Sequence, residues 1–169
     1  MTNAVSLAQQ ASTGVSQGFK NRIINGAMVI DQRNGGASIT PTSGQFSVDR
    51  WKMVLSQASK YTAQQNAGSV TSPAGFTNYL GITSSSAYSV LSSDYFFISQ
   101  GIEGYNMADL NWGSANAKTA TLSFWVRSSL TGTFGGSIGN VNGDRSYPFS
   151  YTISSANTWE YKTVTITVS

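Results

Sequence analysis

Cysteine and histidine are both absent from this chain of 169 residues. Without cysteine the chain can form no disulfide and no thiolate metal site. The lack of histidine further removes the common catalytic triads, imidazole general bases and imidazole metal sites. We therefore predict a protein that is not an enzyme and that carries no cofactor.

Charged side chains are scarce as well, at 10% of the residues against roughly 25% in typical soluble domains. Serine, threonine, glycine and asparagine take their place, with 27, 17, 17 and 12 copies. The ten Lys and Arg residues are spread along the chain, so we expect no nucleic-acid partner, which would need a basic cluster. No apolar run approaches ~18 residues, and we expect no membrane insertion.

The few carboxylates restrict the remaining enzyme classes. A glycosidase needs two carboxyl groups facing each other across a cleft, and the chain has only two Glu and five Asp. Glu103 and Asp109 are the pair closest in sequence to such an arrangement. We prefer a structural role for Glu103, paired with an arginine or with the backbone.

Alternating polar and apolar residues are abundant, which is typical of half-buried strands. The last third of the chain shows the pattern most clearly, at 119–127, 149–153 and 164–168. Further strands are predicted at 21–33, 48–55, 79–83 and 95–103, and residues 105–117 favour a short helical turn or an irregular loop.

Short strands separated by polar loops predict an all-β fold, and their spacing favours a jelly-roll-like β-sandwich over residues 21–169. The strand at 164–168 is followed by no turn and no partner strand. We expect its edge to be completed by further residues of the protein or by a neighbouring chain, because an unpaired apolar edge invites aggregation.

Residues 1–20 differ from the rest because they have little apolar surface and two glycines in a polar stretch. One interpretation is a disordered terminus. The other, which we adopt, is an extended arm that anchors the protein on another protein, with four apolar contact candidates: Val5, Leu7, Val15 and Phe19.

Several motifs resemble those of phage tail-fibre and minor virion structural proteins. These motifs are N-R-I-I-N-G-A-M-V-I-D-Q-R at 21–33, S-V-D-R-W at 47–51, I-S-Q-G-I-E-G at 98–104, L-S-F-W-V-R at 122–127 and T-W-E-Y-K-T-V-T-I at 158–166. The resemblance implies a jelly roll related to carbohydrate-binding modules, assembled as a homotrimeric fibre or fibre-like appendage. It also implies a virion location, tail, baseplate or capsid partners, and host attachment.

The N-terminus lacks the basic start and long apolar run of a secretory signal, so we expect synthesis in the host cytoplasm. Two alternatives stay open beside a tail fibre. One is a capsid-decorating or head-fibre assembly protein without a receptor, and the other is a glycan-binding adhesion module.

Aromatic side chains are the best candidates for a binding site. Trp125 breaks the apolar alternation of its strand, so subunit packing, a second core layer and ligand binding all remain open for it. Trp112 lies in a loop beside Asn111 and is the other candidate sugar platform, with Glu103 as a bordering hydrogen-bonding group.

The polar segment N-V-N-G-D at 140–144 permits two interpretations. Asn140, Asn142 and Asp144 are oxygen ligands at short spacing and could form a Ca²⁺ site, although the further acidic residues of an EF-hand loop are missing. We prefer a polar hairpin tip between Gly139 and Ser146.

Overall fold

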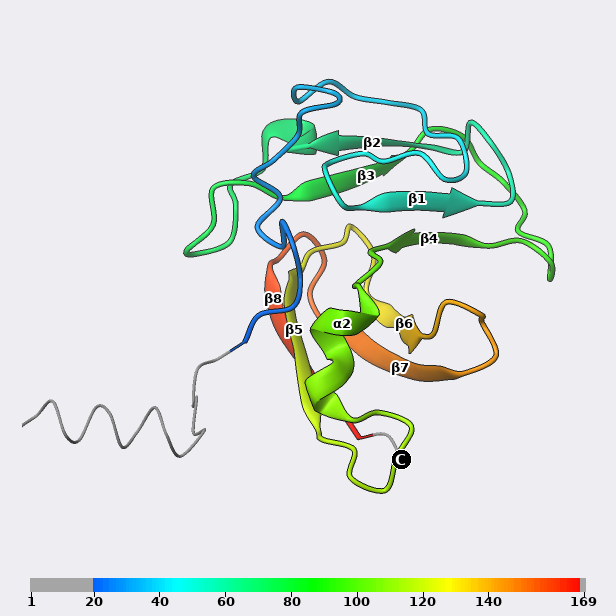
Figure 1. Cartoon of the computed structure of the whole chain (residues 1–169). Helices are drawn as coiled ribbons and strands as arrows, with labels where there is room; N and C mark the ends of the chain where they lie inside the picture. The colour runs from blue at the N-terminus through cyan, green and yellow to red at the C-terminus, as the bar shows by residue number, and fades with distance from the viewer. Residues whose placement is uncertain (1–19, 168–169) are drawn as a thin grey trace, which may run out of the picture.

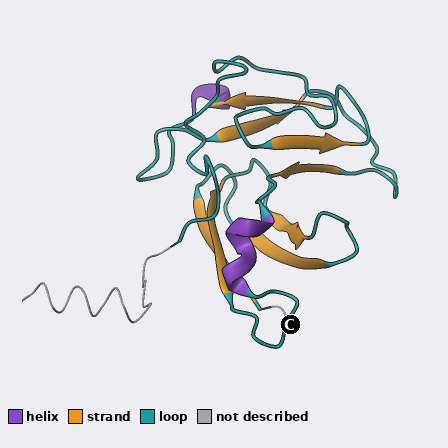
Figure 2. Cartoon of the chain, viewed as in Figure 1, coloured by secondary structure: helices purple, strands orange, loops and turns teal. Residues whose placement is uncertain are grey.

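The computed structural model describes residues 20–167, which form eight short strands with very little helix (Figures 1 and 2). The strands are β1 (Lys52–Leu55), β2 (Tyr61–Gln65), β3 (Leu80–Ser84), β4 (Phe96–Ser99), β5 (Ala120–Val126), β6 (Gly132–Gly139), β7 (Ser146–Ile153) and β8 (Glu160–Ile166). The helical pieces are η1 (Ala67–Ser69), α2 (Gly104–Met107) and η2 (Ala108–Leu110). The predicted all-β class is confirmed.

The strands pair antiparallel in two nested sets. In the first set β1 pairs with β4 and β2 with β3; in the second β5 pairs with β8 and β6 with β7. Figure 1 shows the first set in the upper part of the molecule and the second in the lower part, with α2 beside it. The strands join two at a time, so the sandwich and its jelly-roll order stay predictions.

The first half of the described chain, which holds β1 to β4, has its core between the β1–β4 ladder and the β2–β3 ladder. Met53 and Leu55 of β1 and Ala63 of β2 are buried there, because alternate residues of a strand point to the same face. Tyr61 and Phe96 pack at the side of this cluster with their rings edge to face, 6.2 Å between centroids.

The second half, which holds β5 to β8, also has a core between its two ladders, and aromatic rings fill most of it. Phe124 of β5 lies edge to face on Tyr151 of β7 at 5.0 Å, and Phe134 of β6 stacks on the same tyrosine at 6.0 Å. Ile153 and Ile166 are almost fully buried. The alternation read at 119–127 and 149–153 therefore identifies the residues that face the interior.

Strand β6 was not predicted, and its sequence G-T-F-G-G-S-I-G explains why. Glycine weakens a strand and usually marks a loop. Here Gly136 stands opposite Phe149 in the ladder, and a Cβ added to it would lie 2.5 Å from Cζ of that ring. The ring covers the glycine, so the strand is stabilised by its partner. The last third of the chain thus holds four strands rather than three.

The strand predicted at 21–33 is wrong. These residues form turns, with Asn25 and Met28 at positive φ. The side-chain amide of Asn25 donates to the Ile30 carbonyl at 2.9 Å and accepts the Ile30 N–H at 3.0 Å. One side chain therefore satisfies the backbone groups that a partner strand would otherwise bind.

Other boundaries moved by a few residues. Strands predicted at 48–55 and 95–103 shorten to β1 and β4, while Leu80–Ser84 matches the strand predicted at 79–83. Of the two alternatives for 105–117, the helical turn is found, as α2 and η2, and it begins one residue earlier at Gly104. It ends at Asn111, which takes the left-handed conformation, two residues before Gly113.

Two predictions fall partly or wholly beyond the described range. Except for Lys20, the arm at 1–20, with Val5, Leu7, Val15 and Phe19, lies outside the described residues, as does Val168 of the last predicted strand. Among residues 20–167, no helix has both the length and the apolar character needed to cross a bilayer.

Candidate functional site

A hollow of about 500 Å³ lies at the junction of the two halves. We call it the aromatic hollow, because seven of the residues that line it have aromatic side chains: Trp51, Phe76, Tyr79, Phe124, Trp125, Trp159 and Tyr161. They come from both halves of the chain, so the hollow exists only in the folded molecule.

Three hydrogen bonds, one of them across the junction, hold two aromatic rings of the hollow in place. Trp159, just before β8, donates its indole N–H to the Thr71 carbonyl at 2.8 Å. Its ring lies edge to face on Tyr79, 5.5 Å between centroids. The Tyr79 hydroxyl donates to the Ala67 carbonyl at 2.6 Å and accepts the Val70 N–H at 2.8 Å. These contacts fix both rings, which lowers the entropy cost of binding a ligand.

One wall of the hollow comes from the turn at 25–28. Trp51 donates its indole N–H to the Asn25 carbonyl at 3.0 Å, which holds that turn against the first half. Gln65 of β2 supports the same turn by donating to the Met28 carbonyl at 2.5 Å. The segment misread as a strand is therefore a shaped wall of the site.

Trp125 and Tyr161 form the accessible side of the hollow. They are directly opposite in the β5–β8 ladder, and their rings lie 5.4 Å apart at 54°. Trp125 is half-buried and Tyr161 is 54% exposed. Within residues 20–167 no acceptor is found for the Trp125 indole N–H, so it is available to a ligand.

The rim of the aromatic hollow also carries two asparagine amides. The Asn78 side chain is held by Asn66 and Thr77. The Asn21 side-chain oxygen accepts the Ile23 N–H at 3.0 Å, which leaves its NH₂ group free within the described part of the chain. The site thus combines flat rings with amide hydrogen-bonding groups at their edges.

This combination suits a sugar ring. The face of an aromatic ring is electron-rich, and the C–H groups on one face of a pyranose carry small positive charges. Hydroxyls around the sugar edge then meet amides and indole N–H groups. The volume is within the range of pockets that hold small ligands.

Of the four sequence-predicted glycan residues, only Trp125 lines the aromatic hollow. Trp112 donates its indole N–H to the Lys118 carbonyl at 2.8 Å and so closes its own loop. Asn111, beside it, adopts the left-handed conformation that ends η2. The structure therefore does not gather Trp112, Asn111 and Trp125 into one site.

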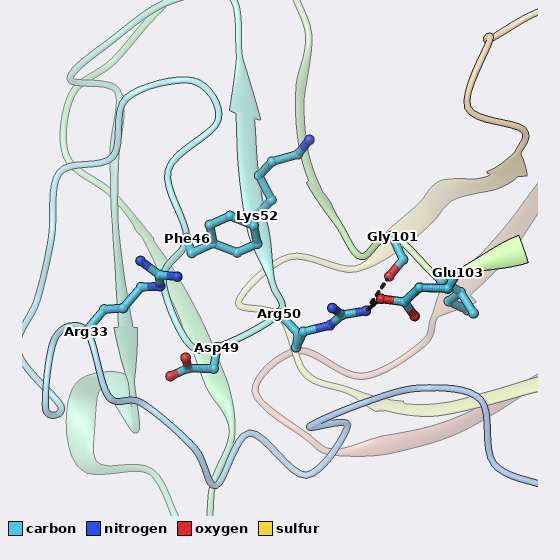
Figure 3. Close-up of a pocket in the computed structure, with 8 residues that line it drawn as sticks. Arg33, Phe46, Asp49, Arg50, Lys52, Gly101 and Glu103 are labelled. Atoms are coloured by element: carbon cyan, nitrogen blue, oxygen red, sulfur yellow. Dashed lines mark hydrogen bonds and ion pairs between the residues drawn. The ribbon is translucent and has the colours of Figure 1, made fainter. Parts of the chain in front are cut away.

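Glu103 lines a different hollow and is paired with Arg50, as the structural interpretation predicted. The Arg50 guanidinium donates to the Glu103 carboxylate at 2.6 Å and to the Gly101 carbonyl at 2.9 Å (Figure 3). The hydrogen bond from Arg50 to the Glu103 carboxylate lowers the pKa of Glu103 below its usual value.

Asp109, the other carboxylate of the pair considered for glycosidase chemistry, is bound by a second arginine. Arg22 reaches both Asp109 oxygens at 2.8 Å. The pKa of Asp109 is held well below its ordinary range by this bidentate hydrogen bond. A glycosidase acid needs a raised pKa, and both groups are shifted the other way.

The hairpin-tip interpretation of 140–144 is confirmed. Residues 140–145 connect β6 and β7, with Gly143 at positive φ. The Asn140 amide donates to an Asp144 carboxylate oxygen at 2.5 Å, so two of the three candidate Ca²⁺ ligands are bonded to each other. Across residues 20–167, no three acidic side chains gather as a metal site would require.

Asp49 forms no ion pair with an arginine within the described chain. The Asp49 carboxylate accepts the Gln32 N–H at 2.7 Å instead. Among residues 20–167, the four ion pairs are Lys20–Asp109, Arg22–Asp109, Arg50–Glu103 and Lys162–Glu160.

Sequence reasoning missed most of the aromatic hollow. Among the aromatic residues of the hollow, only Trp125 was singled out from the sequence. Tyr161 could have been found from its position opposite Trp125, but that position is known only once the register of the β5–β8 ladder is known.

Comparison with protein-family models found no match to this chain, and searches of curated proteins and of solved structures found none either.

Proposed function

We propose that this protein is a non-enzymatic attachment module that binds glycans through the aromatic hollow. The observation that carries the proposal is the set of seven aromatic side chains that line one hollow of about 500 Å³ with amides at its rim. Large rings are usually buried, and a group of rings left partly open at a junction is better explained by a ligand than by packing.

The setting of this activity is proposed from the sequence motifs. They favour a phage virion protein, a tail fibre or fibre-like appendage, which assembles as a homotrimer and is anchored by residues 1–20 to tail, baseplate or capsid. In that setting the glycan would belong to the host surface.

A capsid-decorating or head-fibre assembly role is the second candidate, and a group of exposed apolar side chains supports it. Val90 and Leu91 are 65% and 62% exposed, and Tyr95 and Phe97 are 49% and 50% exposed. The last two rings lie 6.0 Å apart. Other copies of the chain in an assembly would cover such exposed side chains.

A glycan array probed with the full chain tests the leading proposal. We expect Trp125→Ala and Tyr161→Ala to lose most of the binding, because each removes one ring of the accessible wall. Tyr105→Ala is the matched control, since Tyr105 is 93% exposed and does not line the hollow.

Thermal melting of each variant separates lost binding from lost folding. If the wild-type protein, tested as the assembled oligomer, binds no glycan on the array, the result contradicts the proposal and favours the assembly role. Equal binding by the Tyr161→Ala variant and the wild type would contradict the assignment to this hollow.

A further inference from the structure

The dipeptide Asn-Gly occurs three times in the sequence, with its asparagine at Asn25, Asn34 and Asn142. In this dipeptide an asparagine side chain can react with the next backbone nitrogen, because glycine has no Cβ to hinder the approach. All three copies lie within the described residues, and their surroundings differ.

The carboxamide of Asn25 is held at both its nitrogen and its oxygen. The NH₂ group donates to the Ile30 and Asp49 carbonyls, each at 2.9 Å, and the oxygen accepts the Ile30 N–H at 3.0 Å. A Cβ added to Gly26 would lie 3.1 Å from Cγ2 of Ile23, so there is little room beside this glycine. Turning the carboxamide toward the Gly26 nitrogen would break three hydrogen bonds.

Asn34 is half-buried, and its side-chain NH₂ group donates to the Ser47 carbonyl. The Asp31 carboxylate accepts the Asn34 N–H at 3.1 Å and the Gly36 N–H at 2.7 Å. The Asp31 carbonyl accepts the Gly35 N–H at 3.1 Å. Both the side chain and the backbone of this second Asn-Gly pair are therefore fixed.

Asn142 is exposed at the tip of the hairpin that joins β6 and β7. Within the described chain its carboxamide has no hydrogen-bond partner, whereas that of Asn140 bonds the Asp144 carboxylate and the Arg145 N–H. A Cβ added to Gly143 would meet no atom within 4 Å apart from its chain neighbours. A single long hydrogen bond, to the Asn140 carbonyl at 3.2 Å, holds the Gly143 N–H. The Asn142 side chain can thus turn toward the Gly143 nitrogen without losing a protein contact.

We propose that Asn142 is a site of spontaneous deamidation and that the fold protects Asn25 and Asn34. The Gly143 nitrogen loses its proton to water or hydroxide and bonds to Cγ of Asn142, while the Cγ–Nδ2 bond breaks and ammonia leaves. Water then opens the resulting succinimide ring. Attack on one ring carbonyl gives aspartate, and attack on the other gives isoaspartate, which lengthens the backbone of the hairpin tip by one carbon.

The reaction changes the charge of the hairpin tip. Each conversion adds one carboxylate and lowers the formal net charge of +3 by one. The new carboxylate lies two residues from Asp144, so the tip becomes the most acidic part of the hairpin. This inference goes beyond the proposed function and does not depend on it.

The test is incubation of the full chain in mildly alkaline buffer, followed by peptide mapping with mass spectrometry. We expect aspartate and isoaspartate to form at position 142 at least about tenfold faster than at 25 or 34, because the other two sites must first break side-chain hydrogen bonds. An acidic form of the intact protein should accumulate in parallel on ion-exchange chromatography.

The same incubation in concentrated urea separates the effect of the fold from that of the dipeptide. Once the chain is unfolded, the rates at Asn25, Asn34 and Asn142 should become similar. Asn142→Gln is the matched variant, because the longer side chain would have to close a larger and less favourable ring. The main acidic form should be lost in this variant.

Three results would overturn the inference. One is conversion of Asn25 or Asn34 in the folded protein as fast as that of Asn142. Another is an Asn142 rate that stays well above the other two in urea, since the fold would then not be the cause. The third is an acidic form that accumulates equally in wild type and Asn142→Gln.

Discussion

Asp94 shows how a single residue organises a loop in a chain with few charges. Its carboxylate accepts the Tyr88 hydroxyl at 2.7 Å, the Leu91 N–H at 2.9 Å and the Ser56 hydroxyl at 2.8 Å. These hydrogen bonds, led by the one from Tyr88, lower the pKa of Asp94 from 3.8 to about 2. They join the segment before β4 to the end of β1.

We predict that Asp94→Asn destabilises the protein at neutral pH and that the difference narrows in acid. A depressed folded-state pKa gives stability that is present above pH 3.8 and is lost as the pH falls through about 2. Urea unfolding of wild type and variant at pH 7, 4 and 2 measures this. Asp144→Asn at the hairpin tip is the control. A difference in unfolding free energy between wild type and Asp94→Asn that stays constant with pH would count against the prediction.

At the scale of elements, β6 shows that a strand can depend on its partner for its stability. The Phe149 ring occupies the place of the side chain that Gly136 lacks. Gly135, in the same strand, has more room. The atom nearest to a Cβ added there is the Phe149 carbonyl oxygen, at 3.8 Å, which is an ordinary contact distance.

We predict that Gly136→Ala lowers the free energy of unfolding by about 1–3 kcal/mol through overpacking. Gly135→Ala should change it by less than about 0.5 kcal/mol. Thermal or denaturant unfolding of both variants measures these changes. Similar changes in unfolding free energy for the two variants would contradict the prediction that the Phe149 ring needs a glycine at position 136.

At the scale of the whole molecule, a few hydrogen bonds join two nested sets of strands. The Trp159 indole N–H donates to the Thr71 carbonyl across the junction, and Arg22 donates two hydrogen bonds to Asp109 of η2. The aromatic hollow lies between the sets, so its shape depends on these contacts.

For the whole molecule we also predict a homotrimer, which would cover exposed apolar groups such as Val90 and Leu91. Light scattering on the purified chain should give a mass of about three times 18.0 kDa. A stable monomer at micromolar concentration would contradict the trimer.

The sequence by itself determined the all-β class and the inward faces of β5 and β7, because alternation along a strand is local information. It also led to the hairpin tip at 140–144 and to the pairing of Glu103 with an arginine. It placed Trp125 on the face opposite Phe124, but left its role open.

Only the tertiary structure decided where the aromatic hollow is. The turns at 21–33 depend on Asn25 bonding Ile30, and β6 depends on Phe149, which alternation does not reveal. The aromatic hollow needs Trp51, Trp159 and Tyr161 from distant parts of the chain. Their proximity follows from strand pairing and packing between the halves, which are long-range contacts that no local pattern encodes.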